Sequence, residues 1–487
     1  MQTCSKVFGR NRSTFRLAVL AALTTYSSPG IDLLVSNNND NGPGSLRQAV
    51  LDNNTAGGGS TITFSNVVTG SITLTSGHLL ITKPVTILGP GPKILAVNGN
   101  ATSRGFYVSN TANVVISGLA ITNGFVSGSY PNNLGGAIWN ARSTLTLLNC
   151  VISGNRGGDG PGGAIYNDST FGTAWCSFEY CTVSNNSTTN HGGAIYNNCY
   201  QGTGGMSFYA SALIGNTALA SDSVGGAVFN DGTSGNATIA FNSSTISGNT
   251  ANQFGGGIYS GTGSGITYVA LDYSTVCSNS AFSAGGIRQN GAGGSATLAL
   301  RSTLLKTGTS GATIVNDLGN VVDYGFNMSS DNGGGVLIQP TDYINVNPLL
   351  GPLADNGGPT LTHALLPGSP AIDKGYNGVS GSELTPDQRG ELRPFDFALI
   401  ANTPGGNGTD IGAFEVGRPR LNLQYSGTNA VLLWPAFSAE FNLQTATNLT
   451  APSNWITAGG AAVLVGDQYL QTNSPISNNR FFRLKQN

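Results

Sequence analysis

Acidic side chains that could do acid–base or metal chemistry are few in the central part of this chain. Between residues 111 and 310 there are only six, namely Asp159, Asp168, Glu179, Asp222, Asp231 and Asp272. Enzymes that cleave polysaccharides need carboxylates gathered on one face, to bind calcium or to serve as acid and base. Only Asp168 and Asp231 hold equivalent positions, each directly after the Asn of a repeated phrase, and no basic residue clusters beside them.

A second chemical pattern is an aromatic residue inside the phrase Gly-Gly-Ala-Ile-aromatic-Asn. Successive copies place there Trp139, Tyr166, Tyr196, Phe229 and Tyr259, followed by Arg288 in the last copy. Aromatic faces can stack on sugar rings or pack against a partner surface. An arginine is costly to bury unpaired, which favours a slot that faces outward. Two alternatives stay open, because long loops could cover these residues or the rings could stack inside the protein.

The phrase returns with a period typical of a solenoid. Its aliphatic residue falls at positions 138, 165, 195, 228, 258 and 287, a spacing of 27 to 33 residues. A second Asn series is preceded, eight and ten residues earlier, by apolar residues that are two apart, as one face of a strand requires. This series is Asn155, Asn186, Asn216, Asn249 and Asn279. Each coil then holds three strands, and the predicted fold is an all-β parallel β-helix.

This geometry separates the two equivalent carboxylates. Two coils apart, Asp168 and Asp231 would stand about 10 Å from each other, which is long even for an inverting pair of glycosidase carboxylates. We therefore predict no catalytic residue. The two Asn series are predicted to be structural, with stacked amides bonding one another and the bent backbone. Cys150 and Cys181 share one position in neighbouring coils, so they form either a disulfide or a buried thiol pair.

The flanking segments differ from the repeats and define further units. Residues 1–30 have basic residues, a short apolar run at 17–23 and a small or polar stretch, which is typical of an export signal. Residues 31–60 predict an N-terminal cap with a strand at 32–35 and a helix near 45–51, and residues 61–345 predict the β-helix. Residues 346–416 predict a charged module that closes the end of the helix. Seven short strands at 421–487 predict a small β-sandwich.

The charged module could hold a metal or an ion-paired network. An ion-paired network is the favoured interpretation, with Arg389 or Arg393 against Asp410 or Glu415 at its centre. The three histidines, at positions 78, 191 and 363, are too scattered to predict a zinc site. No metal or cofactor is therefore predicted.

Several phrases resemble known bacterial families. The Gly-Gly-Ala-Ile repeats and residues 39–49 resemble the polymorphic outer-membrane protein group of surface proteins, which have a right-handed parallel β-helix. Residues 348–358, 366–373, 387–390 and 410–415 resemble the choice-of-anchor Q module, and the C-terminal segment resembles fibronectin-like domains of secreted bacterial proteins. The resemblance implies a pectin-lyase-like, right-handed solenoid on the outside of a bacterium. Because that fold also carries polysaccharide lyases and glycoside hydrolases, it does not decide function.

The composition narrows the partners. Charged residues make up 9% of the 487 residues and the formal net charge is −2, so there is no electrostatic case for nucleic acid. Beyond the N-terminus no apolar run reaches the roughly 18 residues that span a bilayer. We predict a non-catalytic secreted or outer-membrane surface protein, an adhesin or envelope component. Its expected partners are polysaccharides, cell-surface glycans or other envelope proteins, and the alternative is a polysaccharide lyase or glycoside hydrolase.

Overall fold

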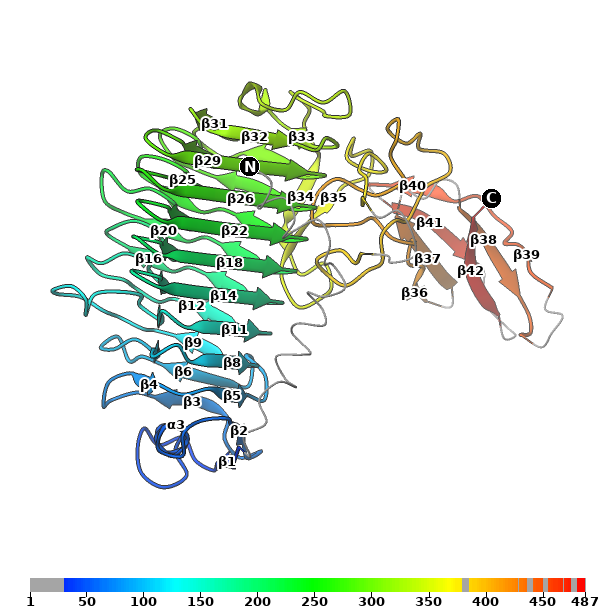
Figure 1. The fold of residues 1–487 in the computed structure, drawn as a ribbon. Helices are drawn as coiled ribbons and strands as arrows, with labels where there is room; N and C mark the ends of the chain where they lie inside the picture. The colour runs from blue at the N-terminus through cyan, green and yellow to red at the C-terminus, as the bar shows by residue number, and fades with distance from the viewer. Residues whose placement is uncertain are drawn as a thin grey trace.

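The computed structural model describes residues 30–378, 385–427, 429–435, 441–449, 454–466, 468–473 and 480–486. The predicted export signal, apart from its last residue, lies outside the described residues. Three long parallel sheets wind together into one solenoid, which stands as a ladder of strands in Figure 1. The predicted parallel β-helix with three strands per coil is confirmed.

Each coil contributes one strand to each sheet, and each strand pairs with its equivalent in the next coil. The eleven-stranded sheet contains β1 (Asp32–Val35), β2 (Ser60–Phe64), β5 (Val85–Leu88), β8 (Asn113–Ser117), β11 (Thr144–Leu148), β14 (Thr173–Glu179), β18 (Thr203–Tyr209), β22 (Asn236–Asn242), β26 (Ile266–Asp272), β29 (Ser295–Arg301) and β32 (Asn320–Asp323). The ten-stranded sheet contains β3 (Gly70–Thr73), β6 (Leu95–Asn98), β9 (Ala120–Thr122), β12 (Val151–Ser153), β15 (Thr182–Ser184), β19 (Ala212–Ile214), β23 (Thr245–Ser247), β27 (Thr275–Asn279), β30 (Leu304–Thr307) and β33 (Met328–Ser329).

The nine-stranded sheet is built from the repeated phrase and its earlier counterparts. It contains β4 (Leu79–Ile81), β7 (Phe106–Val108), β10 (Ile138–Ala141), β13 (Ile165–Asp168), β17 (Ile195–Asn198), β21 (Val228–Asp231), β25 (Ile258–Gly261), β28 (Ile287–Asn290) and β31 (Ile314–Asp317). A small sheet of β16 (Ser187–Thr188), β20 (Thr217–Ala218) and β24 (Thr250–Ala251) forms in the loops that precede the Gly-Gly pairs. The repeat pattern of the sequence does not predict this small sheet.

Equal residues stack on equal residues inside the solenoid. Phe178, Phe208 and Phe241 lie in register, and their ring centroids are 4.4 and 4.6 Å apart in nearly parallel planes. Such pairs add about 0.5–1.5 kcal/mol each beyond the area they bury. All three rings are essentially inaccessible to solvent, so one strand position supplies a continuous aromatic core across three coils.

Both predicted Asn series are buried ladders of amide hydrogen bonds. The side-chain Nδ2 of Asn167 donates to Oδ1 of Asn197 at 2.8 Å, and Nδ2 of Asn197 donates to Oδ1 of Asn230 at the same distance. In the second ladder Asn186 donates in the same way to Asn216 at 3.0 Å. Because a buried amide without partners costs about 1–3 kcal/mol, the ladders satisfy groups that the tight turns would otherwise leave unpaired.

A short helix packs against the first strands of the solenoid. Helix α3 (Leu46–Thr55) begins at Ser45, whose side chain accepts a hydrogen bond from the backbone N–H of Gln48. The helix buries Leu46, Ala49 and Val50 against the first strands. This arrangement closes the apolar interior at the N-terminal end.

Residues 346–416 lie against the flank of the ten-stranded sheet instead of over the end of the solenoid. Thr245 donates to Oε1 of Gln388 at 2.6 Å, and Ser247 lies 2.8 Å from Nε2 of His363. The end itself is covered by the preceding segment, which contains the 3-10 helix η1 (Gly333–Gly335) and buries Leu337 in the solenoid core. Residues 346–416 pack on this sheet because its outward surface carries apolar residues such as Leu304. Packing removes these residues from water.

Two strands and a shared apolar cluster hold this segment in place. Strands β34 (Leu350–Ala354) and β35 (Thr362–Leu365) pair antiparallel and stand beside the solenoid in Figure 1. Their neighbours Ile372, Phe397 and Ile411 pack in one cluster with Leu304 of the solenoid. The domain boundaries of the sequence analysis stay predictions, but the cluster shows that this segment and the solenoid share a core.

The C-terminal segment forms two antiparallel sheets, as predicted. One contains β36 (Asn422–Ser426), β37 (Asn429–Pro435), β41 (Gln468–Asn473) and β40 (Val463–Val465). The other contains β39 (Ile456–Thr457), β38 (Phe441–Ala446) and β42 (Phe481–Gln486). Leu432, Trp434 and Leu443 are buried in a common cluster. No helix of the described residues is long and apolar enough to cross a membrane.

Candidate functional site

The nine-stranded sheet carries the predicted aromatic residues on its outer surface. Trp139, Tyr166, Tyr196, Phe229 and Tyr259, here called the aromatic column, lie opposite one another in five successive coils. The residues on either side of Trp139, Ile138 and Asn140, are fully buried, whereas Trp139 is partly exposed. The column therefore points away from the interior, the direction that the sequence analysis favours, and its binding role stays a prediction.

Much of the column is covered. Tyr166 is only 5% exposed, and neighbouring rings pack on one another, with the Tyr166 and Tyr196 centroids 5.3 Å apart. The loops before the Gly-Gly pairs add His191, 5.8 Å from the ring of Phe229. Burial raises the pKa of Tyr166 and of Tyr196 above the usual tyrosine value. The alternative of cover by loops therefore holds for Tyr166, which offers little surface to a ligand.

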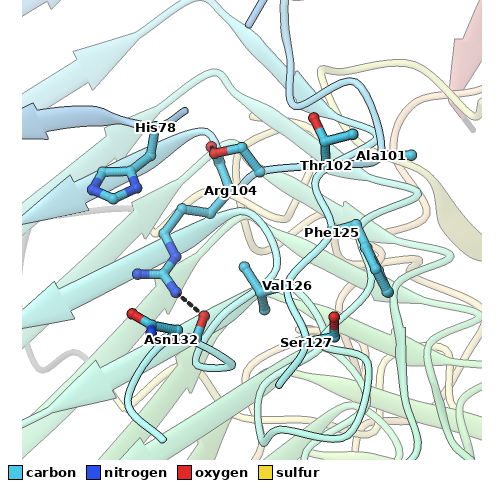
Figure 2. Close-up of a pocket in the computed structure, with 9 residues that line it drawn as sticks. His78, Ala101, Thr102, Arg104, Phe125, Val126, Ser127 and Asn132 are labelled. Atoms are coloured by element: carbon cyan, nitrogen blue, oxygen red, sulfur yellow. Dashed lines mark hydrogen bonds between the residues drawn. The ribbon is translucent and has the colours of Figure 1, made fainter. Parts of the chain in front are cut away.

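The two ends of the column carry arginines. Arg288 follows Tyr259 in register, stacks on Phe254 at 3.7 Å and pairs with Asp317 at 2.7 Å, which offsets the cost of placing a cation there. At the other end Arg104 lies over Trp139 at 5.2 Å and lines a pocket (Figure 2).

The stack has one more member, Tyr107, which the repeated phrase does not predict. Tyr107 of β7 lies opposite Trp139, with ring centroids 4.3 Å apart and planes 7° from parallel. Its strand lacks the Gly-Gly pair that marks the later copies, so the phrase did not identify it. A small residue, an apolar residue and an aromatic residue follow one another at Gly105, Phe106 and Tyr107, as they do in the later copies. This shorter pattern could have predicted the position of Tyr107.

A second surface lies where the nine-stranded sheet turns into the eleven-stranded sheet. Four stacked turns, at 171–173, 201–203, 234–236 and 264–266, line a shallow depression of about 650 Å³ that is widely open to solvent, here called the corner groove. None of its lining residues is charged, and its polar groups are the hydroxyls and amides of residues such as Thr173, Gln201 and Asn236. Across three strand spacings the groove extends about 14 Å along the solenoid.

Exposed aromatic rings stand at one end of the corner groove. Phe171 is 67% exposed, and its ring meets that of Tyr200 edge to face at 5.9 Å. Trp175 lies two residues beyond the groove residue Thr173, on the same outward side of β14, and is 39% exposed. Phe171 has a φ of 53°, a left-handed conformation that is rare for a bulky residue. Exposed aromatic rings can pack on the C–H face of a sugar, and the hydroxyls and amides of the groove can bond its hydroxyl groups.

The two equivalent carboxylates are bound within the structure. Oδ1 of Asp168 accepts hydrogen bonds from the backbone N–H and hydroxyl of Thr170 and from Nδ2 of Asn198. Oδ2 of Asp231 accepts from the hydroxyl of Tyr196 at 2.6 Å, and its Oδ1 accepts from the backbone of Thr233. They stand on strands β13 and β21, two coils apart. These hydrogen bonds stabilise the turns of the corner groove. They do not bring Asp168 and Asp231 together as a pair.

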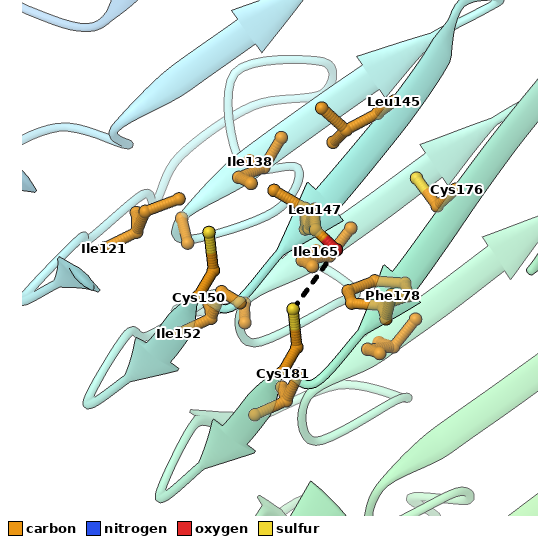
Figure 3. Packing of buried hydrophobic residues seen from close by; sticks show 14 of the residues in the cluster. Ile121, Ile138, Leu145, Leu147, Cys150, Ile152, Ile165, Cys176, Phe178 and Cys181 are labelled. Atoms are coloured by element: carbon orange, nitrogen blue, oxygen red, sulfur yellow. Dashed lines mark hydrogen bonds between the residues drawn. The ribbon is translucent and has the colours of Figure 1, made fainter. Parts of the chain in front are cut away.

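The predicted cysteine pair lies in the core as free thiols. Cys150 and Cys181 are buried beside Leu147, Ile152 and Phe178 (Figure 3). Each thiol donates to backbone, Cys181 to the carbonyl of Leu147 at 3.3 Å. Of the two alternatives, the structure supports the thiol pair. The next coil fills the position with Ser211, whose hydroxyl bonds the backbone in the same way.

The charged module contains the predicted ion-paired network. Arg393 is fully buried, pairs with Glu415 at 3.0 Å and donates to the carbonyls of Asp410 and Gly412. Arg389 pairs with Asp387 at 2.8 Å. Burial raises the pKa of Asp410 well above its usual value. Since backbone N–H groups and arginines take up these carboxylates, the network stabilises the module's own fold.

Comparisons with known proteins add little to this picture. No protein-family model matches the chain, and no curated protein matches it. Among solved structures it is similar to a tailspike protein double mutant of E. coli bacteriophage HK620, at 11% identity and a TM-score of 0.28, over 90% of this chain and 88% of that chain. The resemblance to surface-protein repeats and to the anchor module stays a prediction. Among the described residues no group of three His, Cys, Asp or Glu is placed to hold a metal ion.

Proposed function

We propose that this chain is a non-catalytic, glycan-binding β-helix of the bacterial cell exterior, an adhesin or envelope component. The observation that carries the proposal is the corner groove, where Phe171, Tyr200 and Trp175 are exposed beside uncharged polar groups. Contiguous exposed apolar patches on a protein surface often mark a site for a ligand or partner. The four turns stack coil upon coil with a central Gly in each, which gives an extended surface along which a polymer can lie, although the residues on either side of the Gly differ.

The chemistry of the groove favours a neutral stretch of glycan. Sugar rings present C–H faces, which pack on aromatic rings, and hydroxyls, which exchange hydrogen bonds with amides and hydroxyls. Thr173, Gln201 and Asn236 supply both donors and acceptors, and none of the lining residues is charged. One exposed cation lies close by, since the side chain of Arg142 packs against Gly172 at one end of the groove. The aromatic column is the weaker candidate surface, because Tyr166 is 5% exposed and its neighbours are half-buried.

Location outside the cell is the second part of the proposal. It rests on the signal-like pattern of residues 1–30 and on the anchor-like phrases between 348 and 415. Fractionation of the producing cells tests this part. Recovery in the medium or with the outer membrane is the expected result, and recovery only in the cytoplasm contradicts it.

Polysaccharide cleavage is the alternative function. Asp168 and Asp231 each lie three residues before a turn of the corner groove, which keeps this alternative testable. Their side chains are bound by Thr170, Asn198 and Tyr196, and they stand two coils apart. Reducing-sugar and unsaturated-product assays on pectin, alginate and glycosaminoglycans should show no turnover. Turnover that is lost in Asp168→Ala or Asp231→Ala would establish the enzyme instead.

Glycan-array binding of the full chain tests the glycan-binding part. The double variant Phe171→Ala and Tyr200→Ala should weaken the best hit at least tenfold, about 1.4 kcal/mol. Phe282→Ala is the matched control, because Phe282 is 85% exposed and does not line the groove. The pair Tyr166→Ala and Tyr196→Ala tests the aromatic column. If no glycan binds, or if only the column variants lose binding, the corner groove is not the site.

A further inference from the structure

A separate pocket lies at the N-terminal end of the aromatic column. It has a volume of about 460 Å³ and is lined by His78, Thr102, Arg104, Phe125 and Asn132, among others (Figure 2). This is the size of site that holds a small ligand. The pocket shares no lining residue with the corner groove, so its ligand chemistry can be considered by itself.

Arg104 is a buried cation without an acidic partner. It is 4% exposed, and its guanidinium donates to the backbone carbonyl of Asn132 (Figure 2). Its Nε has no hydrogen-bond partner among the described residues, and no described carboxylate pairs with it. By contrast, Arg393, the other deeply buried arginine, is paired with Glu415. An unpaired buried charge is expensive, and an incoming anion would relieve that cost.

The groups around Arg104 strengthen the preference for an anion. Trp139 lies under the guanidinium, and its indole N–H is buried without a partner. His78 packs on Tyr107 at 5.7 Å, and burial, together with the charges of Arg104 and Arg47, lowers its pKa to about 4. Arg47 is itself paired with Asp40. The pocket therefore holds one buried, uncompensated positive charge and a neutral imidazole at pH 7, and the exposed Arg156 lies over the ring of Phe125 at its edge, at 5.5 Å.

The other walls suit a ligand that is more than a bare ion. Phe125 offers a partly exposed ring, while Thr102, Ser103 and Ser127 offer hydroxyls. A carboxylate can take two parallel hydrogen bonds from a guanidinium. An apolar wall and hydroxyls then remain for a ring that carries hydroxyl groups.

We propose that this pocket binds the carboxylate of an acidic sugar, a uronate unit of a glycan, through the unpaired guanidinium of Arg104. The proposal rests on the glycan-binding function only in taking the occupant to be a sugar. A negatively charged sugar unit would then bind at this end of the solenoid, and an uncharged part of the glycan would bind at the corner groove.

Calorimetry with trigalacturonate as the probe tests the pocket. Arg104→Gln should weaken trigalacturonate binding at least tenfold, and the fully methyl-esterified trimer should bind wild type as weakly as the acid binds the variant. Arg288→Gln is the matched control, since Arg288 lies at the opposite end of the same outer surface and is neutralised by Asp317. Equal binding of acid and ester, or no effect of Arg104→Gln, overturns the proposal.

A second measurement needs no variant and stays decisive if Arg104→Gln fails to fold. Bound carboxylate should raise the pKa of His78 in the wild-type protein, which NMR can follow among only three histidines. If inorganic phosphate or sulfate produces the same shift and trigalacturonate does not displace it, the site binds simple anions and the proposal is wrong. Corner-groove variants separate the two ideas, because loss of neutral-glycan binding there leaves the Arg104 response intact.

Discussion

The ring of Trp175 occupies the space that a side chain at Gly205 would fill in the next coil. A Cβ at Gly205 would lie 2.1 Å from Cζ3 of Trp175 and 2.6 Å from Cε3, and the two residues are direct partners in the parallel sheet. Because Gly205 has no side chain, the indole of Trp175 can lie across this strand next to the corner groove. A glycine inside a strand often marks such a close approach.

Gly205→Ala should displace Trp175 and weaken glycan binding without unfolding the chain. We expect at least a fivefold loss of affinity, because the indole can rotate away from the surface at small cost to the solenoid. Titration calorimetry with the best array hit measures it. Gly263→Ala is the matched control two coils further on, where a Cβ meets only Thr233 at 3.4 Å or more. Equal effects of the two variants would contradict this role of Trp175.

Asn197→Ala should break the first amide ladder in its middle. Two side-chain bonds of 2.8 Å are lost, so the buried amides of Asn167 and Asn230 each lose one partner. Asn167 keeps its bonds to Asn140 and Ala174, and Asn230 keeps its bonds to Ala237 and Ser260. The free energy of unfolding should fall by roughly 2–4 kcal/mol. Urea unfolding followed by circular dichroism gives the value, with the exposed Asn320→Ala as a control near zero. A loss below 1 kcal/mol would mean that the ladder does not stabilise the fold.

Arg393→Met should loosen the module on the flank of the solenoid. Glu415 would be left as a buried charge without its partner, at a cost of about 3–5 kcal/mol. Limited proteolysis should cut within 346–416 much faster in this variant than in wild type. Arg420→Gln should leave the cleavage pattern unchanged, because its pair with Glu391 is largely exposed. Unchanged proteolysis of Arg393→Met is the contrary result.

The contribution of Asp373 to stability should fall as the pH rises from about 4 to about 7, whereas His78, whose folded pKa is lowered to about 4, contributes the opposite slope. Burial raises the pKa of Asp373 to about 7, while an unfolded aspartate titrates near 3.9. In that window the folded state holds a proton that the unfolded state has released, so each step to higher pH favours unfolding. Urea midpoints at pH 5 and pH 8 measure the slope. Asp373→Asn should flatten it, and an equally steep slope in the variant would refute the assignment.

The periodic part of the fold could be predicted from the sequence because each coil repeats the same chemistry. The inward Ile, the two Asn ladders and the three strands per coil all follow from spacing along the chain. An ion-paired network in residues 346–416 followed from the density of charge there, but the sequence left Arg389 or Arg393 against Asp410 or Glu415 open, and only the structure shows that Arg393 pairs with Glu415. The flanking position of residues 346–416 did not, because contacts such as Thr245 with Gln388 join segments 143 residues apart.

The candidate site was harder to predict for the same physical reason. The aromatic column was found from its period and points outward, but loop residues such as His191 cover part of it. Phe171, Tyr200 and Trp175 are not repeated along the solenoid, so no periodic pattern predicts them. The folded turns bring them to one surface. Arg104 indicates an anion site only because the structure shows it buried without a carboxylate partner among the described residues.

Hydrogen–deuterium exchange of the full chain with and without its best neutral glycan tests the central claim most directly. Binding at the corner groove predicts slower exchange of the backbone amides in 169–175 and 200–205, with little change in the loops beside Tyr166 and Tyr196. Protection confined to those loops, or no protection anywhere in the solenoid, would contradict the claim that the corner groove is the glycan-binding site.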